Sequence, residues 1–360
     1  NSPPVVVAIP GQPNKYYIIT NDATATTAGT IRVSEVDMSL QGNNIINPNI
    51  PAPALGDVGA LKAVPVTNLD NEAEAMIIIP HSNGTDFWLI TQEAGTGDFN
   101  ISTITAAGLT GAATPATPTT VIPGGTGITF RATQFAYHAP TGQLAVAVSD
   151  VRKNAMVFDF NNTTGTLSFD PSDGFVFNSA ATSGSAVPAI YDVEWSNDGN
   201  YLYVSRQGEA GTPGDVIQFD RVTTSVTPVS VLTQSIAKSY GLQIAPDSSI
   251  YHLYQATTGG PFLVGRITDP DSVASLANYE SVPFGSVDFN ATQFPSFLAK
   301  SPQVITLDFD VSGTCANSPT TFFPKVTPAA DSLVWDFGDG AGGSREWSPT
   351  YTYTQGQAYP

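Results

Sequence analysis

The stretch Tyr191–Ser205 (YDVEWSNDGNYLYVS) joins two apolar segments through a polar turn, and a third apolar segment, Val216–Asp220 (VIQFD), follows after a loop. Short runs rich in Val, Ile and Tyr, separated by Asn, Asp and Gly, are typical of β-strands connected by tight turns. This stretch therefore predicts three strands of one small sheet.

The same unit recurs along the chain, which indicates an internal repeat. Its five copies are Val5–Met38, Ala75–Leu109, Phe135–Asp159, Tyr191–Asp220 and Leu242–Ile267. A spacing of about 40 to 60 residues is typical of four-stranded β-propeller blades, which pack on their neighbours around an axis. Most propellers need more than five blades to close. We therefore expect an all-β propeller that is seven-bladed when complete, with its first blades before Asn1, or else an unusually small ring.

Several of the predicted strands are apolar at every position, as in Ala75–Ile79 and Leu144–Val148. A strand with one solvent-exposed face would alternate apolar and polar residues. Both faces of these sheets should therefore be covered by other parts of the protein. The segment Ala106–Gly127 is rich in Ala, Thr, Gly and Pro and cannot build a core of its own. We expect it to be an exposed excursion between two blades.

A different pattern begins near Pro302. Alternating runs such as Val304–Phe309, a strand carrying Trp335 and the run Pro349–Tyr353 suit a small β-sandwich. The expected domains are a propeller at residues 1–300 and a sandwich at residues 301–360.

The run Trp335–Gly340 (WDFGDG), followed by Pro349–Tyr353 (PTYTY), closely resembles the signature of PKD domains, which are immunoglobulin-like modules of extracellular proteins. The resemblance implies that this module is incomplete, because the family continues for one or two strands beyond the position of Pro360. Asp336 and Asp339 are expected to cap a turn by accepting bonds from backbone amides.

The order of several motifs resembles the large propeller-plus-PKD surface proteins of Bacteroidetes, which are often labelled gliding-motility-associated and are exported by type IX secretion. The motifs are Pro10–Thr20, Ser34–Met38, Asp86–Thr91, Tyr191–Ser205 and Gln293–Leu298. The resemblance implies an extracellular or outer-membrane-surface location and supplies no catalytic motif.

The excess of acidic over basic residues excludes some classes of binding partner. The chain has 13 basic and 31 acidic residues, giving a formal charge of −18. Nucleic-acid binding requires clustered Lys and Arg, so we expect no nucleic-acid partner. No stretch of about 18 apolar residues occurs, so we expect no membrane insertion. The single Cys315 excludes a disulfide within the chain and is expected to be a buried small hydrophobe.

No catalytic or cofactor-binding residue is predicted. His81, His138 and His252 lack metal-ligand spacing, and we interpret them as structural or solvent-facing. The chain has no nucleophile elbow and no phosphate-binding loop.

Two acidic loops offer the hard oxygen ligands that calcium takes. Asp170 and Asp173 lie in one loop, and Asp269 and Asp271 in another. These four are weak metal candidates, because Asp-Pro and Asp-Gly turns explain their positions without an ion. Calcium is the only cofactor considered.

The sequence therefore favours a non-enzymatic adhesin that binds a glycan or protein ligand at the cell surface through propeller loops, with a link to gliding motility. One alternative is a hydrolase of lactones or glycans, which requires carboxylates or histidines from several blades to converge in a central funnel. Another is a cargo, or a component, of the type IX export machinery, which is in any case the expected partner during secretion.

Overall fold

The fold was obtained as a computed structural model, which describes residues 3–24, 26–42, 55–111, 133–148, 154–169, 175–178, 189–208, 211–223, 229–232, 234–282, 289–295, 306–313, 315–327, 333–340 and 343–354. These residues form small antiparallel sheets and one short 3₁₀ helix, η2 (Ala274–Leu276). None of their helical segments has the length and apolarity to cross a bilayer. The chain divides into two compact units, Asn1–Ser301 and Pro302–Pro360.

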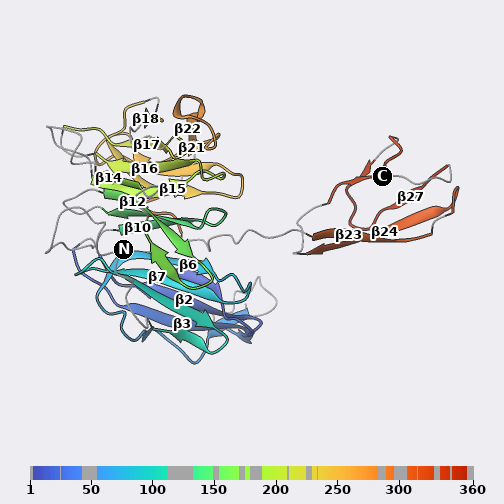
Figure 1. The fold of residues 1–360 in the computed structure, drawn as a ribbon, viewed down its shortest axis with the longest axis horizontal. Helices are drawn as coiled ribbons and strands as arrows, with labels where there is room; N and C mark the ends of the chain where they lie inside the picture. Colours follow the sequence, from blue (N-terminus) through green and yellow to red (C-terminus); the bar gives the residue numbers. More distant parts are fainter. Residues whose placement is uncertain are drawn as a thin grey trace, which may run out of the picture. The chain divides into compact units, whose positions relative to one another are not determined.

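The described residues of unit 1 form five sheets, which are numbered in chain order (Figure 1). Sheet 1 is β1 (Val5–Ala8), β2 (Lys15–Asn21), β3 (Ile31–Gln41) and β4 (Leu55–Val58), with β5 (Val64–Pro65) also paired to β3. Sheet 2 is β6 (Glu72–Pro80), β7 (Phe87–Glu93), β8 (Phe99–Thr105) and β9 (Gly108–Thr110), and sheet 3 is β10 (Thr133–His138), β11 (Gln143–Val148), β12 (Asn154–Asn161) and β13 (Thr166–Ser168), with β14 (Phe175–Asn178) also paired to β12. Sheet 4 is β15 (Ala189–Trp195), β16 (Tyr201–Gln207), β17 (Asp215–Asp220) and β18 (Val229–Ser230), and sheet 5 is β19 (Lys238–Ile244), β20 (Ile250–Gln255), β21 (Leu263–Ile267) and β22 (Tyr279–Val282).

The sheets fan out from their first strands. Within each sheet the main strand order follows the chain, as hairpins require. Among the described residues, each first strand neighbours the first strand of the next sheet, in the series β1, β6, β10, β15 and β19. Every extensive contact between strands of different sheets includes one of β6, β10, β15 or β19. This is a propeller-like arrangement of five sheets, and the number of blades in a complete ring stays a prediction.

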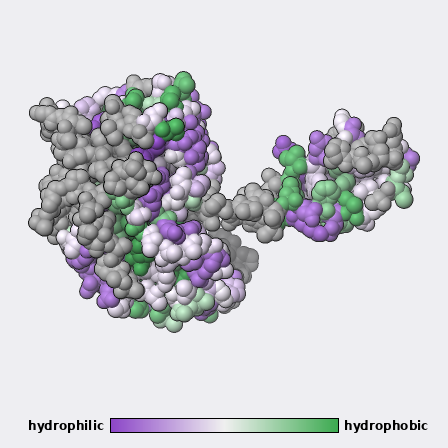
Figure 2. Space-filling view, in the orientation of Figure 1, coloured by the Kyte–Doolittle hydropathy of each residue, from purple (hydrophilic) through white to green (hydrophobic). Residues whose placement is uncertain are grey.

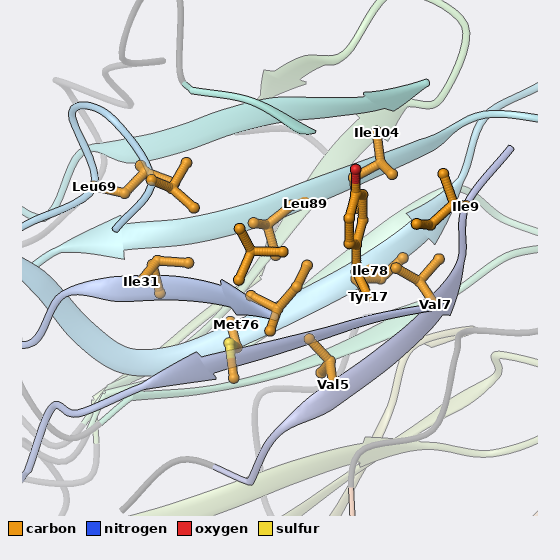
Figure 3. Packing of buried hydrophobic residues seen from close by; sticks show 13 residues of the cluster. Val5, Val7, Ile9, Tyr17, Ile31, Leu69, Met76, Ile78, Leu89 and Ile104 are labelled. Carbon is orange, nitrogen blue, oxygen red and sulfur yellow. The ribbon is translucent and has the colours of Figure 1, made fainter. Parts of the chain in front are cut away.

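The hydrophobic core is divided into layers between successive sheets. One cluster lies between sheets 1 and 2, where Tyr17, Leu89 and Ile104 pack together (Figure 3). Similar clusters fill the space between sheets 2 and 3, 3 and 4, and 4 and 5. Because the middle sheets are covered on both faces, their strands are buried at nearly every position, as the continuous apolar runs predict.

Side-chain size explains how sheets 3 and 4 fit together. On β11, Leu144 and Val146 face sheet 2, whereas Ala145 and Ala147 face sheet 4. The small alanines leave room for Trp195 of β15, which is only 2% exposed. Its indole nitrogen donates a hydrogen bond of 3.2 Å to the carbonyl of Ala136. Large and small side chains therefore alternate across this interface, which permits close packing.

Hydrogen bonds near the turns also join neighbouring sheets. His138, in the turn of sheet 3, has Nε2 3.0 Å from the carbonyl oxygen of Asn197 in the turn of sheet 4. Asn197 in turn donates to the carbonyl of Ser248 in sheet 5, at 2.9 Å. Between sheets 2 and 3, Trp88 donates to the carbonyl of Asn162 at 2.8 Å. Trp88 lies on β7 and Asn162 follows β12, so this third bond joins its sheets at a different position from the other two.

Part of the expected loop Ala106–Gly127 is a strand. Gly108–Thr110 forms β9, which pairs with β8 at the edge of sheet 2, and Thr103 and Thr110 join their hydroxyls at 2.6 Å. The prediction of an exposed excursion is therefore wrong for the start of this segment, because a Gly-containing turn returns the chain to the sheet. Residues 112–127 lie outside the described residues.

Unit 2 contains a three-stranded sheet of β23 (Thr306–Ser312), β24 (Pro319–Thr327) and β27 (Thr350–Thr352), and a pair of short strands, β25 (Trp335–Asp336) and β26 (Gly343–Ser344). Asp336 accepts a bond from the backbone amide of Gly338 at 2.9 Å, as expected. Asp339 accepts a bond from the hydroxyl of Tyr351 at 2.7 Å, and its predicted bond from a backbone amide stays a prediction.

Cys315 is exposed, which corrects the expectation that it is buried. It lies in the turn between β23 and β24, where its carbonyl accepts a bond from the amide of Ser318. A turn residue on a sheet edge is reached by solvent whatever its polarity, so the apolar character of the thiol does not place it in the core.

The His138 contact can be tested at Gly199, which has φ of +72°. A Cβ at this position would lie 2.4 Å from the His138 ring. Gly84, at the equivalent turn of sheet 2, has φ of +75° and nothing within 4 Å of such a Cβ. Both Gly84→Ala and Gly199→Ala should cost about 1–2 kcal/mol through the positive φ. Gly199→Ala should cost about 1–3 kcal/mol more, because His138 is displaced from Asn197. Urea unfolding measures both, and equal losses would contradict the role given to His138.

Candidate functional site

Two first strands each carry a pair of buried acids. Glu72 and Glu74 lie on β6, and Asp192 and Glu194 lie on β15; all four are at most 8% exposed. Buried carboxylates are rare unless they are paired or hydrogen-bonded, and their pKa values often shift at functional sites. These four side chains are therefore the first candidates for chemistry in unit 1.

Asp192 and Glu194 bind backbone amides of the neighbouring sheet. One carboxylate oxygen of Asp192 accepts from the amide of Leu242 at 2.9 Å, and the other accepts from Val193 at 2.8 Å. Glu194 repeats this arrangement, accepting from Ile244 and from Trp195, both at 2.9 Å. Each acid thus joins its own strand, β15, to β19 of sheet 5.

The reason for this arrangement is the free edge of a first strand. In the described residues β15 pairs only with β16, and β19 only with β20. The amides of Val193, Trp195, Leu242 and Ile244 point away from these partners. A buried amide without a partner costs about 1–3 kcal/mol. The two carboxylates supply the acceptors that a further strand would otherwise provide.

Burial changes the pKa of these acids. It raises the pKa of Asp192 to about 8, against the opposing effect of the bonds from Leu242 and Val193, and the charge of Glu194 raises it further. It raises the pKa of Glu194 to about 7, against the bonds from Ile244 and Trp195. Both oxygens of each group are engaged by amides, so neither is available to a substrate in this arrangement.

Glu72 and Glu74 have different surroundings. Glu72 accepts a bond from the side-chain amide of Asn100 at 2.7 Å, and burial raises its pKa to about 7. Glu74 acts electrostatically on Tyr191 of β15; burial is the main cause of the raised pKa of that tyrosine. The rings of Tyr191 and Tyr240, on β15 and β19, are 5.4 Å apart. Three sheets thus bring polar side chains near one another at their first strands.

This region is where a funnel active site would lie. The Tyr240 hydroxyl donates to Gln255 of its own sheet at 2.9 Å. The charges of Glu74 in sheet 2 and Asp192 in sheet 4 both raise the pKa of Tyr191, so acids of two sheets act on this side chain. The hydrolase alternative requires carboxylates or histidines of several sheets to converge in this way around a shared space.

The three histidines have structural contacts. His81 accepts from the amide of Asn83 at 3.0 Å and stacks on Trp88 with ring centroids 5.1 Å apart. His138 joins sheets 3 and 4, as described above. His252 is fully buried between the hydroxyls of Ser239 and Tyr279, at 2.8 and 2.9 Å, and burial lowers its pKa to about 3.

Only one of the two predicted acidic loops lies within the described residues. Asp170 and Asp173 lie outside the described residues. Asp269 accepts from Thr268 and Asn278, both at 2.7 Å, and the bond from Thr268 is the main cause of its lowered pKa. Asp271 accepts from the amide of Asp198 at 3.2 Å and from Asn197. Within the described ranges, no group of three His, Cys, Asp or Glu could hold a metal ion.

Sequence reasoning missed the buried acids, although a signal was present. In both strands the acids are two residues apart, as Glu72-Ala73-Glu74 and Asp192-Val193-Glu194, within otherwise apolar runs. Acids in a strand covered on both faces must meet polar groups of the protein, because water does not reach them. In β6 a register shift between Glu72 and Met76 breaks the alternation, so the two-residue spacing alone does not put Glu72 and Glu74 on one face.

No protein-family model and no curated protein matches the chain. Solved structures with similar folds include a protein provisionally described as a 6-phosphogluconolactonase from Bacteroides uniformis, with 12% identity over 90% of this chain and 83% of that one and a TM-score of 0.42. Sqt1 from Chaetomium thermophilum has 11% identity over 89% of this chain and 68% of that one, with a TM-score of 0.43. A chain of a nidogen/laminin complex has 9% identity over 87% and 92%, with a TM-score of 0.41. These likenesses assign no activity to the chain.

The inter-sheet role of Asp192 predicts a loss of stability in Asp192→Asn. The amide group that replaces one carboxylate oxygen cannot accept from a backbone N–H, so one edge amide loses its partner at a cost of about 1–3 kcal/mol. Asp220→Asn is the matched control, because the bonds shown for Asp220 in the described residues come from amides of its own turn, Val222 and Thr223. Chemical denaturation measures both variants. A loss no larger than that of the control would contradict the inter-sheet role.

The raised pKa values also predict a pH dependence. Unfolded Asp and Glu ionise near pH 4, whereas Asp192 and Glu194 in the folded protein ionise near pH 8 and 7. Between these values the folded state binds more protons, so the free energy of unfolding should fall as pH rises from about 4 to about 8. The double variant Asp192→Asn/Glu194→Gln should show a shallower fall in denaturation curves recorded across this range. An unchanged slope would contradict the assignment.

Proposed function

We propose that this protein is a non-enzymatic binding protein of the cell exterior. In this proposal the sheets of unit 1 form a rigid scaffold that presents a glycan or protein ligand site, and unit 2 acts as a PKD-like spacer. Export by the type IX machinery and a part in gliding motility belong to the same proposal, and they are supported only by the sequence resemblance.

The observation that carries the proposal is the use of the buried acids. Both carboxylate oxygens of Asp192 and of Glu194 accept hydrogen bonds from backbone amides, two of which lie in β15 and two in β19. A general acid or base must reach the proton it transfers. Carboxylates that replace missing strand partners serve rigidity instead, and a rigid frame lowers the entropy cost of presenting a binding surface.

The exposed face of sheet 1 also supports binding. Residues opposite the core on β1 and β2 include Val6 and Tyr16, which are 50% and 38% exposed. Tyr16 lies beside Val36 of β3, and Val36 lies beside Val58 of β4, which is 43% exposed. Figure 2 shows small hydrophobic areas among hydrophilic ones on the visible face of unit 1. An apolar row containing an aromatic ring suits contact with a sugar face or a protein side chain.

A hydrolase acting on lactones or glycans is the second candidate. The raised pKa of Glu72, about 7, suits acid–base chemistry near neutral pH, and the Tyr191 region lies where a funnel would open. A third possibility, that the chain is type IX cargo or part of the export complex, has no support in the geometry.

A glycan array combined with a hydrolase screen separates the first two proposals. We expect the purified chain to bind at least one glycan class without hydrolysing lactones or aryl glycosides. Tyr16→Ala should weaken that binding by roughly tenfold or more. The contacts of an aromatic ring with a bound ligand contribute about 1–3 kcal/mol of binding free energy. Val229→Ala, which alters a 53%-exposed residue of sheet 4, should leave binding unchanged. Hydrolysis abolished by Glu72→Gln, with no glycan binding, would overturn the binding proposal.

A further inference from the structure

The strand β23 of unit 2 lies at the edge of its sheet and is exposed. In the described residues β23 pairs with β24 alone, so its other edge is free (Figure 1). Apolar side chains occupy every second position of this strand, and Leu307 is 68% exposed, Phe309 51% and Val311 43%. An exposed edge strand with apolar side chains is a surface to which another strand can add.

These apolar side chains lie on the inner face of the sheet. Val311 is opposite Phe322, which is 6% exposed, and opposite residues of an antiparallel pair share a face. The ring of Phe309 lies 5.9 Å from that of Phe322 and 5.7 Å from that of Trp335 in β25. The aromatic core of unit 2 therefore reaches the surface at β23, where an added strand would extend it.

The backbone of β23 presents hydrogen-bonding groups to the free edge. Phe309 is opposite Pro324, which has no N–H. The amide of Phe309 donates to the carboxylate of Asp308 at 2.8 Å, so it points away from β24. In an antiparallel pair the N–H and C=O of one residue point to the same side, and this side alternates along the strand. Leu307 and Val311 therefore also direct their backbone groups to the free edge.

Asp308 repeats half of the arrangement that joins sheets 4 and 5. There, Asp192 accepts from the next amide of its own strand with one oxygen and from Leu242 of the neighbouring strand with the other. Asp308 accepts from the next amide of its own strand through Oδ1, and no hydrogen bond to Oδ2 is recorded in the described part of unit 2. This second oxygen is placed to accept an amide of an added strand.

The acids of β23 determine which strand fits. Asp308 and Asp310 lie on the outer face, where Lys325 of β24 donates to Asp310 at 2.6 Å. Two copies of β23 paired antiparallel about Phe309 would place Asp308 of one opposite Asp310 of the other, and like charges at opposite positions are destabilising. The acids thus protect the edge from a second copy of the chain, whereas a strand with Lys or Arg between apolar residues matches both faces.

We propose that β23 binds an extended segment of another protein, in which Lys or Arg alternates with apolar residues, as an added strand. The backbone groups of Leu307, Phe309 and Val311 supply hydrogen bonds, and their side chains supply apolar contact. Asp308 and Asp310 attract the basic side chains of the segment. This surface goes beyond the spacer role proposed for unit 2 and does not depend on the ligand site proposed for unit 1.

Fluorescence anisotropy with labelled peptides and the full chain tests the surface. One probe alternates Lys and Val over seven residues, the length of β23, and a second probe alternates Glu and Val. The basic probe should bind more tightly by roughly tenfold or more. Asp308→Lys/Asp310→Lys should reverse this preference. Asp70→Lys/Asp220→Lys, which makes the same change of net charge in unit 1, should retain it, and equal effects of the two double variants would overturn the proposal and indicate general charge attraction only.

A proline variant separates strand addition from contact with side chains. Val311→Pro removes an N–H at the free edge, a position that an edge strand tolerates, and should weaken binding of the basic probe by roughly tenfold or more. Val311→Ala keeps the N–H and should weaken binding less, with circular dichroism showing that both variants fold. Equal binding by the two variants would contradict strand addition. Dimerisation of the chain in sedimentation, abolished by Val311→Pro, would overturn the basic partner and indicate a second copy.

Discussion

Unit 1 depends on how it satisfies the free edges of its first strands. A strand at the edge of a sheet has unpaired amides, and at the centre of a fan of sheets these amides are buried. Between sheets 4 and 5 the solution is a pair of carboxylates, Asp192 and Glu194, that accept from amides on both strands. A further amide of β19, that of Gly241, donates to the carbonyl of Thr292 at 2.9 Å. Side chains and a later segment thus replace the missing strand.

This solution has consequences for function. Carboxylates held by amides keep a fixed geometry, and burial moves their pKa values toward neutrality without making them catalytic. A raised pKa in such a position reports desolvation, and the contacts of the group decide whether it can act on a ligand. The same distinction applies to His252, whose two ring nitrogens are engaged by Ser239 and Tyr279. The polar interior of the described fan therefore supports rigidity more directly than chemistry.

The strands could be predicted well because their signals are local. Continuous apolar runs such as Leu144–Val148 gave covered strands, and turns such as Ser196–Gly199 gave hairpins. The predicted burial of Cys315 and the predicted exposed loop at the start of Ala106–Gly127 were wrong. Composition says little about where an edge strand or a turn lies. Asp269 and Asp271, two of the weak metal candidates, accept hydrogen bonds within a turn and between sheets, and their role as calcium ligands stays a prediction. Nothing local distinguishes these roles.

The sequence by itself determined that the chain forms short strands in a repeated order, since alternation, apolar runs and turn residues act over a few positions. Only the tertiary structure decided which sheets face each other and which acids are buried between them. Asp192 accepts a hydrogen bond from Leu242, which is 50 residues away in the sequence, and Glu72 accepts one from Asn100, which is 28 residues away. Such contacts depend on the rotation and bulges of whole sheets, which no short window of sequence specifies.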